Sequence, residues 1–136
     1  MNLMKEKSIK LVDSVRNLLV LDPENRKVKL DLYSLNIQRG RDHGLPTFNQ
    51  MRAALGLPKL TSFYQLVSDS KIAWKLERIY SSIDDLDIIV GIFAEDFVPN
   101  GVLGETGAKI VGETFRNLRD GDRHWYELGY PHSVIR

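Results

Sequence analysis

Apolar side chains recur at helical spacing along most of the chain, and this spacing predicts an all-α fold of about six helices. The first such segment covers residues 8–20. The other segments with this pattern cover residues 32–40, 47–55, 61–67, 70–80, 82–95 and 105–120. Residues 87–94 are rich in Ile and Val and could be a buried strand, but the capping residues before them favour a helix.

Capping residues predict where several of these helices begin and end. Asp31 is suited to cap the helix that starts at residue 32, and Thr47 is suited to cap the next one, which Gly56 ends. Ser82 has the position and chemistry to open the helix over residues 82–95, because its hydroxyl can accept from the first free amides. A hydrophobic content of 43% and a charged content of 27% are typical of a globular protein, so a disordered chain is not expected.

A pair of glycines is expected to end the helix that starts at residue 32. Gly40 and Gly44 lack a Cβ atom and release the backbone from helical geometry. Residues 41–43 between them would then form a turn, in which the Asp42 carboxylate pairs with a neighbouring arginine.

The same helix carries polar groups on the face that its leucines mark. Leu32, Leu35, Asn36 and Arg39 fall at i, i+3, i+4 and i+7, so they share one face, which we expect to be the buried one. A buried amide needs a hydrogen-bond partner and a buried guanidinium needs an anion. The pattern therefore predicts that another group, such as a cofactor, supplies both.

The segment LNIQRGRDHGLP at residues 35–46 resembles the signature in the C-terminal half of the animal-type haem peroxidases. The similarity continues on both sides, with VDSVRNLL at residues 12–19 and FRNLRDGDRHWYE at residues 115–127. It covers nearly the whole chain and also favours a helix at residues 87–94. The resemblance implies that residues 1–136 are the C-terminal portion of a haem peroxidase domain, truncated at both ends.

The resemblance also implies two haem-binding residues. In that family, the asparagine at the position of Asn36 hydrogen-bonds the proximal histidine, and the arginine at the position of Arg39 faces a haem propionate. An acceptor on the imidazole N–H makes the histidine a more electron-rich ligand, and the planar guanidinium fork suits a carboxylate. Asn36 and Arg39 are therefore the predicted cofactor-binding residues, and haem is the predicted cofactor.

The groups that perform the chemistry in the family have no counterpart in this chain. The axial histidine, the distal residues and the calcium loop belong to segments upstream of the signature. The resemblance places no axial ligand at His43, and we expect His43, His124 and His132 to be structural. No catalytic residue or metal ligand is therefore predicted here, and the chain alone is expected to be inactive.

Composition narrows the classes of partner. A net charge of +1 without a basic stripe argues against nucleic acid. No stretch approaches the ~20 apolar residues of a membrane span, and the N-terminus lacks the apolar run of a signal peptide. The chain contains no cysteine, although many secreted members of the family carry disulfides, so the compartment stays open.

Two functions remain as alternatives. The first is a piece of a haem-dependent peroxidase, which reduces hydrogen peroxide while oxidising a halide or an organic donor and contributes to the response to oxidative stress. Its partners would be haem and the missing N-terminal part of the domain. The second is a non-catalytic helical interaction module derived from a peroxidase. An open reading frame upstream that encodes an axial-histidine helix would favour the first.

Overall fold

Helices make up the regular structure of residues 31–129, the part of the chain that the computed structural model describes. No strand forms within this range, and the predicted all-α fold is confirmed. In chain order the elements are α2 (Leu32–Asp42), α3 (Phe48–Ala54), α4 (Phe63–Leu66), α5 (Ser70–Ile79), the 3-10 helix η1 (Ile83–Asp85), α6 (Ile88–Ala94), α7 (Glu105–Gly121) and α8 (Tyr126–Gly129). The helix predicted over residues 8–20 lies outside the described residues.

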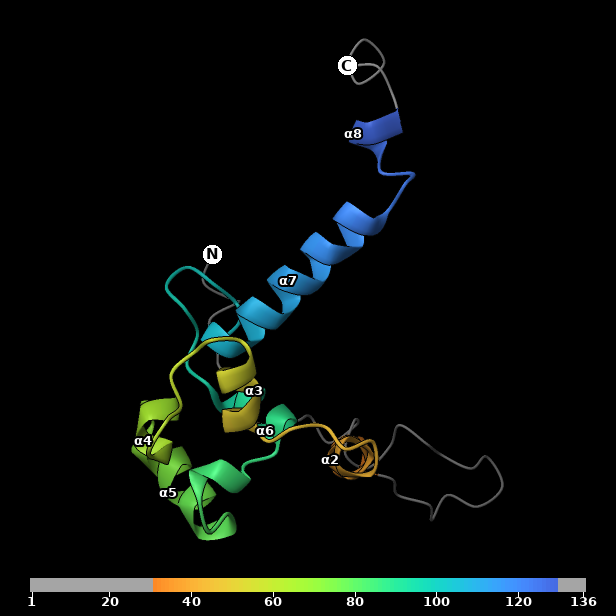
Figure 1. Cartoon of the computed structure of the whole chain (residues 1–136). Coiled ribbons are helices and arrows are strands. Elements are labelled where there is room, and N and C mark those ends of the chain that lie inside the picture. The colour runs from red at the N-terminus through yellow and green to blue at the C-terminus, as the bar shows by residue number, and fades with distance from the viewer. Residues whose placement is uncertain (1–30, 130–136) are drawn as a thin grey trace, which may run out of the picture.

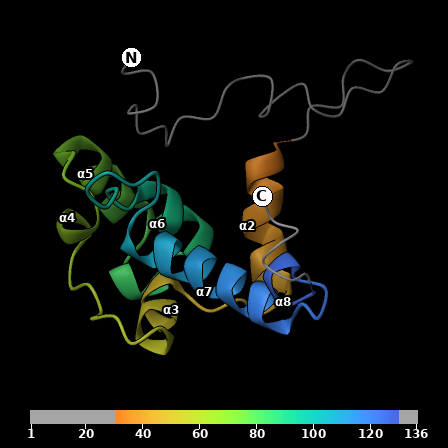
Figure 2. The ribbon, with the colours of Figure 1, turned by 90° about the horizontal axis from the view of Figure 1, so that it is seen from above.

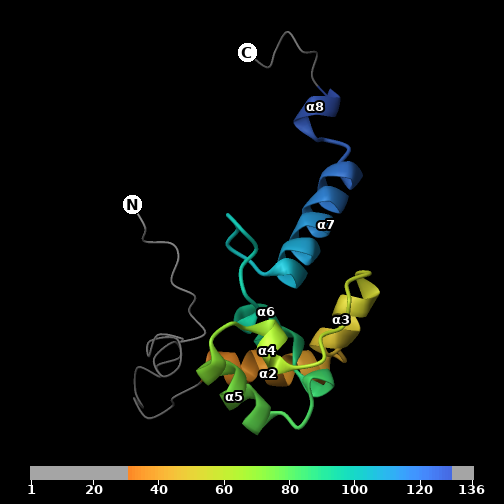
Figure 3. The same ribbon diagram turned by 90° about the vertical axis from the view of Figure 1, so that its left-hand side faces the viewer.

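Helices α3 and α6 lie at the centre of the fold, between the α4–α5 pair on one side and α2 on the other (Figure 1 and Figure 2). Helix α7 runs outward from this group and carries α8 at its far end (Figure 3). Ten buried apolar residues from α3 to α6 form the core. They are Phe48, Phe63, Leu66, Val67, Ala73, Leu76, Ile83, Leu86, Val90 and Ala94.

The central helices approach closely because α6 contains a glycine at their contact. A Cβ atom on Gly91 would lie 2.2 Å from Cδ2 of Phe48, the fully buried residue that opens α3. A larger residue at position 91 would therefore have to displace an aromatic ring from a packed interior.

The predicted caps are confirmed. Asp31 Oδ1 accepts hydrogen bonds from the backbone amides of Tyr33 at 3.0 Å and Ser34 at 3.3 Å. Thr47 forms a capping box with Gln50, in which each side chain accepts from the other residue's backbone amide. Gly56 follows α3 with φ of +69°, a conformation in which a Cβ atom would be strained.

The predicted end of α2 at Gly40 is wrong, because the helix continues to Asp42. An interior glycine costs a helix only about 1 kcal/mol relative to alanine, so the hydrogen-bond ladder can continue through it. Gly44, with φ of +66°, is the residue that turns the chain. The Asp42 carboxylate accepts from Gln38 Nε2 at 2.8 Å, not from an arginine as expected.

The single helix predicted over residues 82–95 is two elements. Ser82 Oγ accepts from the Asp84 amide at 3.2 Å and opens η1 as a cap should, but Leu86 is extended and separates η1 from α6. Leu86 is fully buried, and its carbonyl accepts from the Phe48 amide at 2.8 Å. Packing against α3 therefore overrides the helical preference of this segment.

A buried ionic network joins α3 to the start of α7. Arg52 is 3% exposed, and its guanidinium donates to Glu95 Oε1 and to Glu105 Oε2, each at 2.9 Å. The Thr106 amide donates to the second Glu95 oxygen at 2.9 Å. No local pattern in the sequence indicates this network, because Arg52 is 43 to 54 residues away from its three partners.

Candidate functional site

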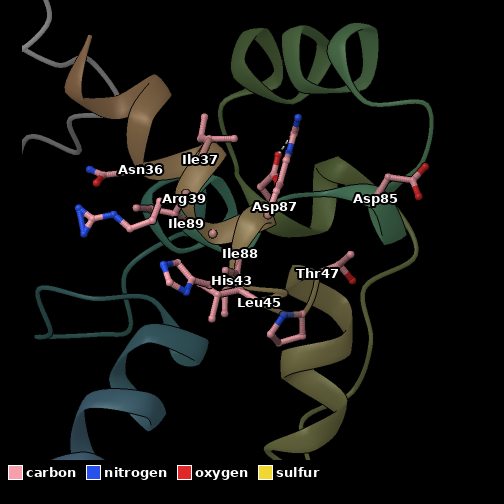
Figure 4. A pocket seen from close by; sticks show the side chains of 13 residues that line it. Asn36, Ile37, Arg39, His43, Leu45, Thr47, Asp85, Asp87, Ile88 and Ile89 are labelled. Atoms are coloured by element: carbon pink, nitrogen blue, oxygen red, sulfur yellow. Dashed lines mark hydrogen bonds and ion pairs between the residues drawn. The ribbon is translucent and has the colours of Figure 1, made fainter. Parts of the chain in front are cut away.

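A hollow of about 740 Å³ lies along α2, the loop after it and the start of α6. Figure 4 shows the side chains around it. It is lined by Asn36, Ile37, Arg39, Gly40, Arg41, His43, Leu45, Pro46, Thr47, Asp85, Asp87, Ile88 and Ile89. Both predicted haem-binding residues are in this set, and the volume falls within the range of small-molecule and cofactor sites.

The face of α2 that we expected to be buried is the outer one. Tyr33 and Ile37 pack against the core, with the Tyr33 ring 5.9 Å from Phe93 in an edge-to-face contact, whereas Leu35 is 44% exposed. Leucine spacing therefore predicted the wrong face of α2. A second apolar pair at i and i+4, Tyr33 with Ile37, provided an equally good helical face, and the contact with α6 uses that one.

Asn36 and Arg39 extend to the same side of α2, away from the core, and His43 lies on that side too (Figure 4). Arg39 is exposed and Asn36 is half-buried. Among the described residues, neither side chain has a hydrogen bond or an ion pair. An amide and a guanidinium without internal partners are available to a group outside residues 31–129.

Arg41 lies on the opposite side of α2 and forms a two-point ion pair with Asp87, the residue before α6. Its Nε donates to Oδ1 at 2.9 Å and its Nη2 donates to Oδ2 at 2.6 Å. The Tyr80 hydroxyl donates to the same Oδ2 at 2.7 Å. We had expected an arginine in this segment to pair with Asp42, and no local signal in the sequence points to a partner 46 positions away.

These contacts shift the pKa values of Asp87 and Tyr80. Hydrogen bonding to the Arg41 guanidinium holds the pKa of Asp87 below its ordinary value. Burial, with the hydrogen bond to Asp87 as the next cause, raises the pKa of Tyr80. Asp87 is therefore a carboxylate and Tyr80 a neutral donor at physiological pH.

Tyr33 has a buried hydroxyl with no hydrogen-bond partner in the described part of the chain. Burial, followed by the negative charge of Asp87, raises the pKa of Tyr33 to about 12. The hydroxyl therefore stays protonated, and its ring serves the packing of α2.

The histidines occupy separate places. His43 follows α2 at the edge of the hollow and is exposed, and its amide donates to the Arg39 carbonyl at 3.0 Å. His124 is exposed near α8, while His132 is outside the described residues. Residues 31–129 contain no cluster of three His, Cys, Asp or Glu that could hold a metal ion. Within the same range, no helix is both long and apolar enough to cross a bilayer.

Helix α7 presents a second uncovered surface. Residues 111–120 are all exposed, and the apolar side chains on this part of the helix are Val111, Phe115 and Leu118. Phe115 is 67% exposed and Leu118 is 63% exposed. Soluble proteins rarely expose large apolar side chains side by side, so this face of α7 is suited to contact with further protein.

Comparisons with known proteins place these features in a family context. The model of the family described as animal haem peroxidase matches residues 1–135. Peroxinectin A from Dictyostelium discoideum is 40% identical over 128 residues. The solved structure of peroxidase A from the same organism superposes with a TM-score of 0.73 at 41% identity over 77% of this chain. Rice fatty acid alpha-dioxygenase superposes with a TM-score of 0.72 at 28% identity over 82% of it.

The chain corresponds to a minor part of each of these proteins. It spans 24% of peroxinectin A, 20% of the peroxidase A chain and 19% of the dioxygenase chain. The similarity to both a peroxidase and a dioxygenase means that the shared helices leave the reaction open, because a fold does not determine the chemistry of its site.

Proposed function

Because the chain belongs to the animal haem peroxidase family, we propose that it supplies one wall of the haem site in an enzyme that reduces hydrogen peroxide and oxidises a halide or an organic donor. Residues 1–136 would form part of one peroxidase domain. The remaining segments of that domain would be its partner and would supply the axial histidine and the distal residues. The observation that carries the proposal is that Asn36 and Arg39 line one hollow from the outer side of α2.

The chemistry of this wall fits haem. Haem is a flat, largely apolar ring with two carboxylates on one edge. The hollow offers apolar side chains such as Ile37, Ile89 and Leu45, and the exposed Arg39 guanidinium at its side can pair with a carboxylate. The half-buried Asn36 amide has a free carbonyl oxygen for an imidazole N–H.

Each residue then has a separate task. Bound haem supplies the peroxide-cleaving and electron-transfer chemistry. The Asn36 carbonyl oxygen would accept the proximal imidazole N–H and fix its tautomer, which makes the imidazole a stronger donor to iron. Arg39 would hold a propionate through two parallel N–H···O bonds, which orients the ring as well as retaining it. Neither task requires a proton transfer at this wall.

A haem titration of the 136-residue chain tests the division of roles. We expect weak haem binding or none, because neither Asn36 nor Arg39 ligates iron. A sharp, stoichiometric Soret band that survives desalting would mean that a residue of this chain serves as an axial ligand. His43 would be the first to replace, because it borders the hollow.

A chimera tests the two residues directly. The chain replaces the matching segment of Dictyostelium peroxidase A, so that the host supplies the rest of the site. We expect Asn36→Ala to retain haem, shift the reduction potential and slow peroxide cleavage by roughly 10- to 100-fold. Gln38→Ala is the matched control, because Gln38 is an exposed amide of the same helix that bonds only Asp42.

Arg39→Ala should act differently from Asn36→Ala. We expect faster loss of haem, because a propionate loses its charge partner, and only partial rescue by Arg39→Lys, which lacks the planar fork. Unchanged potential and kinetics in a folded Asn36→Ala chimera would contradict the proposed role. In that case the chain would fit better the alternative of a non-catalytic helical module.

A further inference from the structure

Helix α2 is attached to the rest of the fold by few contacts. None of its residues is fully buried. On the core side it contributes the half-buried side chains of Tyr33 and Ile37, which contact α6 and its neighbours. Apolar contacts are non-directional, so two partly buried side chains leave the rotation of a helix about its axis weakly defined. The other attachment is the ion pair between Arg41 and Asp87.

The ion pair is directional and lies on the side of α2 that carries Ile37, four residues before Arg41. The Arg41 side chain is 58% exposed there and Asp87 is 15% exposed. Asn36 and Arg41 are five residues apart, so at about 100° per residue they point about 140° apart around the helix axis. Arg39 and Arg41 are two residues apart and therefore point about 160° apart around the axis. Figure 4 shows the Arg39 side chain extending away from Asp87. When Arg41 is held against Asp87, Asn36 and Arg39 are therefore turned to the outer side of α2, so the two arginines border the hollow from different sides of the helix.

Asp87 is itself held from several directions. Its carboxylate receives the two Arg41 bonds and the Tyr80 hydroxyl, and it makes no capping bond with its own helix. Its backbone forms a bridge with Thr47 in the segment that follows α2. The anchor of the ion pair is thus fixed to α5 through Tyr80 and to the start of α3 through Thr47.

We propose that Arg41 and Asp87 are positioning residues that set the rotation of α2, and thereby the direction in which Asn36 and Arg39 meet haem. This inference rests on the proposed function. A planar guanidinium that bonds both oxygens of one carboxylate defines an orientation, which a lysine ammonium does not. Loss of the pair would let α2 turn and weaken the contact of Asn36 with the proximal imidazole.

The test uses the haem-loaded chimera described above. Arg41→Gln and Asp87→Asn remove one charge each, Arg41→Lys keeps the charge without the fork, and Arg41→Asp with Asp87→Arg restores a swapped pair. Arg78→Gln is the matched control, because Arg78 is an exposed arginine on α5 that lies outside the hollow. Its guanidinium carbon is 4.9 Å from the centre of the Trp74 ring. The readouts are the haem reduction potential, the rate of peroxide cleavage and hydrogen exchange of the α2 amides.

We expect Arg41→Gln and Asp87→Asn to shift the potential in the same direction as Asn36→Ala, but by less. Peroxide cleavage should slow by up to about 10-fold, below the full effect of losing a group that bonds the metal ligand. Exchange at residues 32–42 should quicken while exchange in α3 stays unchanged. Arg41→Lys should restore part of the potential, and the swapped pair more of it.

The outcomes separate this inference from the proposed function. If Asn36→Ala shifts the potential while Arg41→Gln and Asp87→Asn leave it unchanged, the positioning role is wrong and the haem wall stands. If both variants only lower haem content or melting temperature, with the potential of the loaded fraction unchanged, the pair is merely structural and the inference is also wrong. If Asn36→Ala has no effect, the proposed function fails first and takes the inference with it.

Discussion

Replacement of Arg52 by methionine should strongly destabilise this structure, because it leaves a buried carboxylate without its cation. Glu95 is almost fully buried and would retain only the amide and hydroxyl of Thr106 as donors. The Pro58 carbonyl would also lose the Arg52 Nε donor at 2.8 Å. Removing one partner of a buried pair costs about 3–5 kcal/mol.

That loss is large compared with the total free energy of unfolding of a domain of this size. Domains are stable by about 0.05–0.15 kcal/mol per residue, so about 100 residues are stable by roughly 5–15 kcal/mol. Urea unfolding followed by helical circular dichroism gives the free energy of unfolding for each variant. Glu105→Gln is the control, because Glu105 bonds the same guanidinium but is 55% exposed, and it should cost no more than about 1 kcal/mol.

A double variant identifies the physical cause. Arg52→Met with Glu95→Leu removes both charges and should recover most of the lost stability, since apolar residues often replace a buried pair without cost. A cost of Arg52→Met no larger than that of Glu105→Gln would contradict this prediction. A double variant as unstable as the sum of the two single variants would also contradict it, because the loss of stability would then come from packing.

Three further outcomes are expected. Gly91→Ala should destabilise the chain by about 1–3 kcal/mol, because the new Cβ atom would meet the Phe48 ring. Gly112→Ala should stabilise the chain by up to about 1 kcal/mol, because a Cβ atom there meets nothing within 4 Å. Urea unfolding measures both changes. Folding lowers the pKa of Asp87 below its ordinary value of 3.8. The stability lost in Asp87→Asn should therefore be constant above pH 3.8 and shrink as the pH falls below that value. Unfolding of both proteins at pH 7 and at pH 3 tests this. The isolated chain should self-associate and bind a hydrophobic dye through α7, and Phe115→Glu should reduce both in sedimentation and fluorescence; unchanged dye binding would exclude this face.

Local patterns in the sequence determined the helices and most of their ends. Asp31 and Thr47 cap α2 and α3 as expected, because capping depends on residues within three positions of each other. The helix expected to end near Asp120 does so at Gly121. The family was also available from the sequence, since the signature at residues 35–46 is contiguous.

The tertiary structure alone decided which faces are used and which charges meet. Helical spacing cannot choose between the leucine face of α2 and the face with Tyr33, because the leucines are at i and i+3 and Tyr33 and Ile37 are at i and i+4, and both spacings are helical. On α5, Ile79 follows the buried Leu76 by three residues and so has the spacing of the same face, yet Ile79 is 74% exposed. In each case the neighbour that covers a face comes from a distant segment.

The two ionic links have the same origin. Arg41 pairs with Asp87, which is 46 positions away in the sequence, and Arg52 pairs with Glu95, which is 43 positions away. A periodic pattern reports interactions across one or two helical turns, whereas such pairs form only after packing brings α2, α3, α6 and α7 together. The residues that we propose to bind haem therefore come from one contiguous segment of the sequence, whereas the ion pair that we propose to orient them joins distant segments.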